Sequence, residues 1–234
     1  MAATELGIAV PSADADVLER LLRGRWSCRG YLSERLPRAV IERVLQLAQR
    51  TPSWCNTQPW HVVITEGDGT DRFRQALTKR AAEASMEPDF AFPQRYTGAY
   101  RERRKEVALQ LYESVGIARG DREASAAQTA KNFEFFGAPH VAVITTDADL
   151  GVYGAVDCGL YVQSFLLAAH SLGLGAVPQA ALASYAPVVR EFFALPESRR
   201  VVCGISFGRP DADHPANGFR APRESAASAV TWVD

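Results

Sequence analysis

Guanidinium groups concentrate between residues 20 and 29 of a chain that is otherwise close to neutral. Four arginines surround one serine there: Arg20, Arg23, Arg25 and Arg29 around Ser27. Guanidinium forks make paired, charge-assisted hydrogen bonds to phosphate oxygens, and a serine hydroxyl or a backbone N–H can complete such a shell. The segment therefore predicts a phosphate site. The alternative, which composition alone favours, is a solvated basic end of a helix whose arginines interact with the last carbonyl groups.

A second polar cluster, P-S-W-C-N-T-Q-P-W, occupies residues 52–60 directly before a run of β-branched residues. Its Asn and Gln side chains offer both donors and acceptors, as the edge of a uracil-like heterocycle such as the flavin pyrimidine requires. One alternative is an Asn-based turn held between two prolines. Another is a thiol nucleophile at Cys55 activated by His61, although six residues across a loop-to-strand boundary do not ensure contact.

The sequence contains no motif typical of a metal site, a redox-active dithiol or a common nucleotide-binding loop. The histidines, His61, His140, His170 and His214, show no metal-ligand spacing, and the cysteines, Cys28, Cys55, Cys158 and Cys203, include no C-x-x-C pair. We therefore predict no metal and four reduced thiols. The G-x-G-x-x-G and P-loop signatures are also absent, which argues against a Rossmann dinucleotide site and a Walker-type ATPase.

Length and composition indicate one ordinary globular domain over residues 1–234. Hydrophobic residues make up 47% of the chain and charged residues 23%, and the formal charge is -1. A near-neutral chain has no broad field that attracts nucleic acid or an anionic membrane, so we expect a small-molecule partner. The first eleven residues do not resemble a signal peptide, and we expect no membrane-spanning stretch and a cytoplasmic location.

The periodicity of apolar residues predicts an α+β fold in which helices cover a small sheet. An aromatic loop over residues 86–100 is typical of a pocket lid. Residues 155–172 form an almost wholly apolar helix that belongs at the centre of the molecule or at a subunit interface. A tail over residues 211–234 ends in a strand-like run, 229–233, and we expect it to reach a partner subunit. The expected helices are a first one capped by Asp14 or Asp16, then 37–48, 70–85, 100–115, 121–136, 155–172 and 184–193, and the expected strands are 60–65, 141–145, 176–178 and 200–208.

Three motifs in this order resemble one family. They are R-x-S-x-R-x-Y from Arg25, P-S-x-x-N-x-Q-P-W from Pro52, and G-L-G-x-x-P from Gly173. Their combination resembles the nitroreductase superfamily of FMN-dependent oxidoreductases, and the resemblance runs from about residue 17 to residue 232. It implies a nitroreductase-like fold with a small mixed sheet, and an intertwined homodimer with two equivalent sites.

The resemblance also implies which residues bind FMN. Arg25, Ser27, Arg29 and Arg223 would contact its phosphate and ribityl chain. Pro52, Ser53, Trp54, Asn56 and Gln58 would lie along the isoalloxazine, supplied by the other subunit. The backbone of Pro178, Gln179, Ala180 and Ala181 would approach flavin N5, with alanine where glycine is more usual. Trp26 is a second departure, because many relatives carry another arginine there, and Arg23 is a candidate to share the phosphate. From loop position alone, Phe90, Phe92, Tyr96 and the arginines at 101–104 are candidates for substrate contact.

The implied activity is transfer of electrons from NADPH or NADH, by a ping-pong mechanism, to a nitroaromatic or related small oxidised compound. Two alternatives remain open. The first is a specialised flavin dehydrogenase or dehalogenase of the same fold. The second is a flavin-binding protein without turnover.

Overall fold

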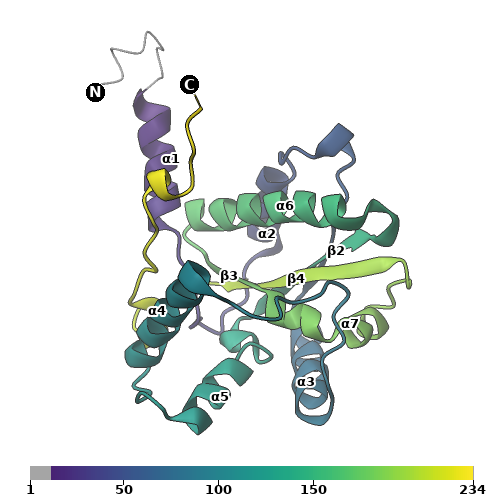
Figure 1. Ribbon diagram of the computed structural model, residues 1–234. Coiled ribbons are helices and arrows are strands. Elements are labelled where there is room, and N and C mark those ends of the chain that lie inside the picture. Colours follow the sequence, from purple (N-terminus) through teal and green to yellow (C-terminus); the bar gives the residue numbers. More distant parts are fainter. Residues whose placement is uncertain (1–11, 234) are drawn as a thin grey trace.

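The computed structural model describes residues 12–233. Helices and strands are interspersed along this part of the chain (Figure 1), with three consecutive helices between β1 and β2. The helices are α1 (Ser12–Gly24), α2 (Arg38–Ala48), α3 (Asp68–Glu83), α4 (Gly98–Ser114), α5 (Arg122–Ala130), α6 (Gly151–Ser171) and α7 (Ala186–Phe192). The strands are β1 (His61–Thr65), β2 (His140–Asp147), β3 (Gly175–Gln179) and β4 (Arg199–Gly208).

The four strands form one sheet in the order β1-β2-β4-β3. All three pairings are antiparallel, so the expectation of a mixed sheet is wrong in this respect while the α+β class is confirmed. Parallel pairing survives only as isolated bridges among the described residues, one of which joins Ser27 to Ala176. That bridge lays the arginine segment along the free edge of β3.

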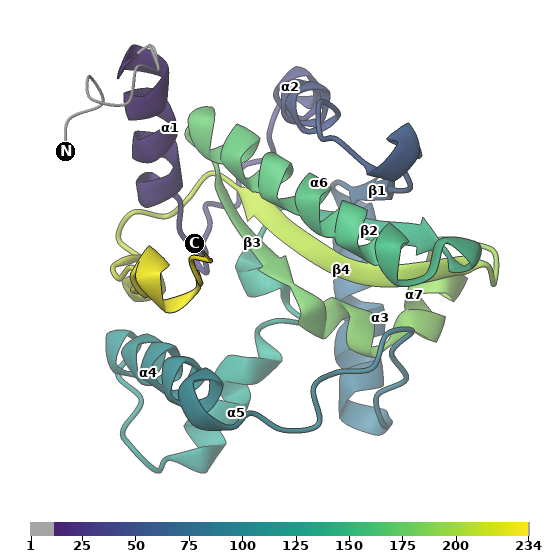
Figure 2. The same cartoon turned by 45° about the horizontal axis from the view of Figure 1, so that its top comes forward.

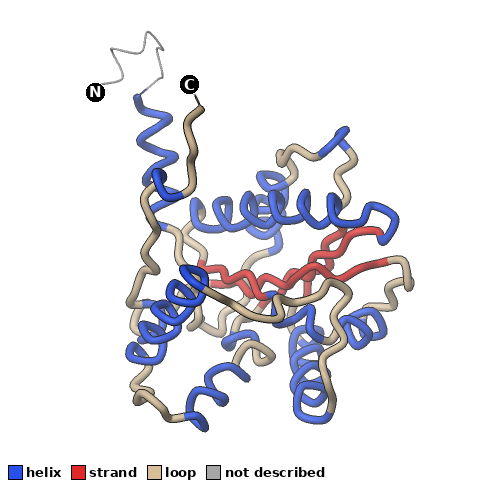
Figure 3. Tube along the Cα trace, in the orientation of Figure 1, coloured by secondary structure: helices blue, strands red, loops and turns tan. Residues whose placement is uncertain are grey.

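Each face of the sheet has its own hydrophobic core, because side chains alternate along a strand. On one face Ile144 and Phe207 pack with α2 and α6. On the other face Val143 and Val201 pack with residues of α3 and α7. Figures 2 and 3 show the resulting layers, with α6 lying across one side of the strands and α3 and α7 on the opposite side.

Helix α6 has two unlike faces. Tyr161 and Phe165 are buried against the sheet, whereas Val152, Val156 and Leu160 are exposed at intervals of four residues and form one apolar stripe. Together with the turn before it, α6 is long and apolar enough to cross a membrane by length and composition, which the sequence analysis did not expect. One face of α6 packs on the sheet in the hydrophobic core. A core helix passes the same test of length and composition as a membrane-spanning one.

Two predicted elements differ from the structure: one helix is shorter than predicted, and the last predicted strand is absent from the described residues. Helix α5 ends at Ala130, and residues 131–134 continue as turns. The helix does not reach residue 136, because Phe135 and Phe136 adopt left-handed backbone angles, with φ of 60° and 52°. The strand predicted for residues 229–233 is absent from the described tail. The Trp232 side chain there is 86% exposed and has no strand beside it to pair with.

Candidate functional site

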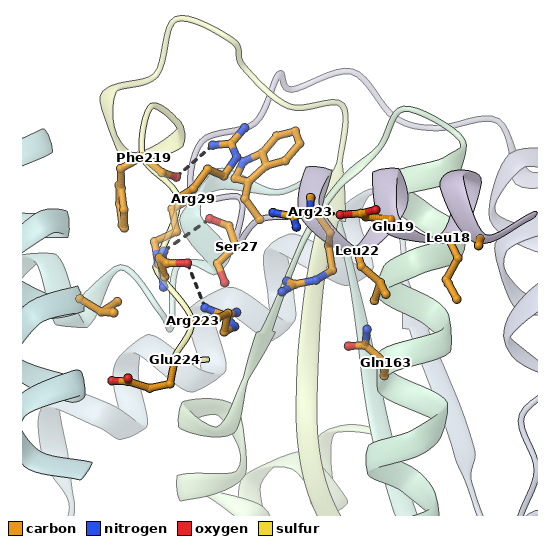
Figure 4. A pocket seen from close by; sticks show the side chains of 16 residues that line it. Leu18, Glu19, Leu22, Arg23, Ser27, Arg29, Gln163, Phe219, Arg223 and Glu224 are labelled. Atoms are coloured by element: carbon orange, nitrogen blue, oxygen red, sulfur yellow. Dashed lines mark hydrogen bonds and ion pairs between the residues drawn. The ribbon is translucent and has the colours of Figure 1, made fainter. Parts of the chain in front are cut away.

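A cavity of about 1030 Å³ opens between α1, α6 and the C-terminal tail. Helix α1 contributes Leu18 and Leu22, and Gln163 comes from α6. The tail closes another side with residues 219–221, 223 and 224, and Val107 of α4 completes the lining. Figure 4 shows Ser27, Arg29 and Arg223 gathered beneath the Phe219 segment. Arg23, Arg25, Ser27 and Arg29 of the predicted segment therefore line a cavity. Arg20 does not line it and is exposed on α1.

The edge of β3 holds this segment in place. The Cys28 backbone N–H donates to the Ala176 carbonyl at 3.2 Å, which continues the Ser27–Ala176 bridge. The close approach requires Gly175, because a Cβ at that position would lie 2.5 Å from Cys28 Sγ. Side chains at residues 25 and 29 are thereby fixed relative to the sheet.

Four of the five arginines that line the cavity have no carboxylate partner in the described chain. Among the described residues, none of Arg25, Arg29, Arg220 and Arg223 forms a salt bridge with a carboxylate. Burial lowers the pKa of Arg25, and the nearby Arg223 guanidinium lowers it further. Burial also lowers the pKa of Arg29. Guanidinium groups that are partly desolvated and that repel one another favour a bound anion.

Three lining or supporting residues were missed by the sequence analysis. Arg220 lines the cavity, and its Nη1 donates to the carbonyls of Asn217 at 2.8 Å and Phe219 at 2.9 Å. The Asn217 side chain is buried and bonds to Arg29 and Gly30. Gln163 is one of the few polar residues of α6. The sequence shows the arginines of the tail and a single amide, Gln163, in an apolar helix. Only the fold brings these residues to one cavity.

Arg23, the candidate to share the phosphate, lines the same cavity. Its Nε donates to Glu19 Oε1 one helical turn away, at 2.6 Å. The charge of Arg23 is thus balanced within α1, unlike the charges of Arg25 and Arg223.

The loop at residues 52–58 is tightly ordered. Asp157 of α6 accepts the Trp54 backbone N–H at 3.1 Å, and Ser53 Oγ accepts that of Gln58 at 2.9 Å. Cys55, Asn56 and Gln58 all have positive φ, between 46° and 56°. Non-glycine residues held in this region mark places where the surrounding structure imposes the conformation, which is frequent at functional sites.

This loop lies apart from the cavity within the chain. Trp54 packs on Tyr153, with ring centroids 4.6 Å apart, near the start of α6. None of residues 52–58 is among those that line the cavity, which meets α6 further on, at Gln163. Asp157 and Gln163 are separated by roughly 9 Å along the helix axis.

The segment 178–181 comprises the last two residues of β3 and the turn after it, two to five residues beyond the position where Ser27 pairs. Pro178 and Ala180 are exposed. Gln179 is buried, donates to the Asn132 carbonyl at 2.9 Å and accepts the Ser206 hydroxyl. Gln179 thus supports the segment from inside, while Pro178 and Ala180 face outward.

The chain is similar to known proteins in both sequence and fold. The sequence profile of the Nitroreductase family matches residues 22–209. The chain belongs to the nitroreductase family. It is 36% identical over 215 residues to nitroreductase NfnB of Mycolicibacterium smegmatis, covering 91% of this chain and 92% of the relative. It is 32% identical over 234 residues to a 4-nitrobenzoate reductase of a Nocardioides species, covering 97% and 93% of the two chains.

The fold agrees closely with a crystal structure from the nitroreductase family. The FMN-dependent nitroreductase NfnB from Mycobacterium smegmatis, solved in complex with NADPH, superposes with a TM-score of 0.89 at 34% identity. The match covers 94% of this chain and 99% of that one. The two proteins therefore share one fold over nearly the whole of this chain.

The aromatic candidates for substrate contact do not line the cavity of the protomer. Phe90 and Phe92 are partly buried in the loop before α4, and the Tyr96 ring lies 5.1 Å from Arg104 Cζ. Their role in a nitroreductase site stays a prediction. The thiol alternative gains nothing from the geometry: Cys55 is exposed, and within residues 12–233 no hydrogen bond joins it to His61.

Proposed function

We propose that this protein is an FMN-dependent oxidoreductase that passes electrons from NADPH or NADH to nitroaromatic or related small oxidised substrates. The observation that carries the proposal is the convergence of Arg25, Arg29 and Arg223, without carboxylate partners in the described chain, on one cavity. Relatives named as nitroreductases and 4-nitrobenzoate reductases, with 92% and 93% of their length matched, support the same activity.

The residues present fit FMN. Arg25, Arg29 and Arg223, with the Ser27 hydroxyl, supply donors for a phosphate dianion, and Arg220 adds a further guanidinium. Pro178 and Ala180, which are exposed, lie beyond Ser27 along the same edge, where the ring system of a phosphate-anchored flavin would extend. When bound, FMN supplies the redox chemistry by accepting electrons from the nicotinamide and passing them to the substrate in a separate half-reaction.

We infer that the working enzyme is a homodimer with composite sites. The stripe of Val152, Val156 and Leu160 runs along α6 between the Trp54 loop and the Gln163 side of the cavity. A twofold partner packed on this stripe with its α6 antiparallel would bring its own Pro52, Ser53, Trp54, Asn56 and Gln58 to the cavity of the first subunit. The exposed tail would then lie against the partner. A cytoplasmic location and a single domain over the whole chain fit this assembly.

The first test is the visible spectrum of the purified protein before and after anaerobic addition of NADPH or NADH. We expect a flavin spectrum that bleaches with the nicotinamide and recovers when 4-nitrobenzoate or nitrobenzene is added. A flavin spectrum that does not bleach would support the binding protein without turnover. Recovery with a quinone or halogenated phenol but not with either nitro compound would support the specialised enzyme.

A second test is the variant Arg25→Gln. Its control is Arg119→Gln, which makes the same change on the exposed turn before α5. We expect about a tenfold or greater loss of FMN affinity only for the cavity arginine, because a charge-assisted bond of 1.5–3 kcal/mol is removed. Failure of the wild-type protein to bind FMN at all would refute the proposal.

A further inference from the structure

Trp26 lies between an imidazole and a guanidinium at the wall of the cavity. Its ring meets that of His170 edge-on, with centroids 5.8 Å apart and an interplanar angle of 83°. The Cζ atom of Arg220 lies 4.4 Å from the centroid of the Trp26 ring. This separation is well within the range of a cation–π contact, and tryptophan is the strongest partner for one.

The contacts that Trp26 makes with the described chain use its ring. Trp26 Nε1 is buried and has no hydrogen-bond partner among the described residues. Every identified contact of the side chain is therefore one of ring face or ring edge. A phenylalanine at this position would keep a ring for Arg220 to lie on and would lose no hydrogen bond.

The Arg220 guanidinium is held by two backbone carbonyls and by the Trp26 ring, and it also faces the cavity. Its Nη1 donates to the carbonyls of Asn217 and Phe219, and its guanidinium lies by the Trp26 ring. The hydrogen bonds it forms within residues 12–233 use Nη1 alone, so the donors on Nε and Nη2 are available. Because Arg220 also lines the cavity, a ligand there can reach them.

Local sequence permits this arrangement. His170, at the end of α6, approaches the backbone of Gly24 so closely that a Cβ at residue 24 would lie 2.5 Å from His170 Nε2. Gly24 thus lets the imidazole support the edge of the indole from the side of α6. The tail supplies Arg220 from a distant part of the chain.

We propose that Trp26 is a positioning residue, which holds the Arg220 guanidinium at the cavity wall so that it binds the phosphate of FMN in addition to Arg25, Arg29 and Arg223. The inference rests on the proposed function, because it takes FMN as the occupant of the cavity.

The test compares FMN with riboflavin, which has the same ring and ribityl chain but no phosphate. Dissociation constants are measured by flavin fluorescence during reconstitution of the full-length protein. We expect Trp26→Leu to weaken FMN binding about 3- to 30-fold, the equivalent of a partly desolvated cation–π contact, and to change riboflavin binding less than twofold. Trp26→Phe, the matched control, should stay within about threefold of wild type for FMN.

A double-mutant cycle decides whether Trp26 acts through Arg220. In an Arg220→Gln background, Trp26→Leu should cause no further loss of FMN affinity, because the group it positions is gone. If Trp26→Leu fails to fold, Trp26→Met fills similar space without a ring and replaces it. Equal losses for FMN and riboflavin, or additive effects of the two substitutions, would overturn the proposal while leaving the proposed function intact. A wild-type protein that binds no FMN would remove both.

Discussion

Single side chains connect segments that lie far apart in the sequence, and Asn217 is the clearest case. Its Oδ1 accepts the Arg29 backbone N–H at 2.8 Å, and its Nδ2 donates to the carbonyls of Gly30 at 2.9 Å and Asp211 at 2.8 Å. The residue is 6% exposed. One amide therefore ties the tail to the segment that carries the cavity arginines.

We predict that Asn217→Ala lowers the free energy of unfolding by about 1–3 kcal/mol, because buried backbone groups lose their partners. For a chain of this size, thermal unfolding should shift down by about 2–4 °C for each kcal/mol. The control is Gln75→Ala, which removes an exposed amide from α3 and should have little effect. Equal melting temperatures for the two variants would show that the tail is held by other contacts.

At the scale of elements, the aromatic loop before α4 is anchored by one buried carboxylate. Asp89, whose side chain is 4% exposed, accepts from Arg190 Nη1 at 2.6 and 2.7 Å and from the Val201 backbone N–H at 2.8 Å. Arg200 adds a bond at 3.2 Å. The loop that carries Phe90 is thus attached to α7 and β4 near its start, and the attachment does not depend on the aromatic residues.

Because Asp89→Asn leaves the buried Arg190 without a counterion, we expect it to reduce stability by about 3 kcal/mol. Urea unfolding measures the change. Asp213→Asn, at an exposed position, supplies the control and should leave the midpoint unchanged. An unaltered midpoint for Asp89→Asn would mean that this ion pair contributes no net stability.

The attachment of β2 to the segment before α2 depends on a neutral histidine. His140 Nε2 accepts the Leu36 backbone N–H at 2.9 Å, and Nδ1 lies 3.2 Å from the Thr65 carbonyl oxygen. Burial lowers the pKa of His140 in the folded protein. The pKa of His170 is also lowered, first by burial and then by neighbouring arginines.

These shifts predict the direction of the pH dependence of stability. Below a pH of about 6.5 the unfolded chain binds protons that the folded chain does not, so the free energy of unfolding should fall as the pH is lowered from 7 towards 5. His140→Gln, which keeps an acceptor for Leu36, should flatten this slope in urea unfolding at several pH values. The same change at the exposed His61 should not. A slope that is unchanged in His140→Gln would contradict the assignment.

At the scale of the whole molecule, the two groups of predicted FMN residues lie at different places on one protomer. Arg25 and its neighbours line the cavity, whereas the Trp54 loop is attached to α6 through Asp157 and Tyr153. The exposed apolar stripe of α6 connects the two places. A site assembled from two copies accounts for both the separation and the stripe.

We therefore predict that Val156→Glu, which places a charge in the stripe, yields a monomer that has lost bound FMN. Sedimentation and the ratio of flavin to protein absorbance measure the two properties together. Met86→Glu places the same charge at an exposed apolar residue outside α6 and should leave both unchanged. A Val156→Glu monomer that retains FMN would show that one subunit is sufficient for binding.

Local patterns in the sequence are sufficient to place most elements and to indicate the family. Apolar periodicity is a local property, and it located α2, α6 and all four strands to within a few residues, while three ordered motifs identified the nitroreductase relationship. Local rules failed where the conformation is imposed by distant parts of the chain. The left-handed angles at Phe135 and Phe136 keep α5 from reaching residue 136, and an isolated apolar run at residues 229–233 has no neighbouring strand to pair with.

Only the tertiary structure decided which arginines share a cavity and what supports them. Ser27 meets Ala176, Asn217 meets Arg29, and Trp26 meets Arg220 across long separations in sequence. The free energy of such contacts depends on burial and on the relative orientation of whole elements, neither of which is encoded in the spacing of nearby residues. The antiparallel order of the sheet is likewise set by long-range pairing, because a strand's own sequence does not specify its neighbours.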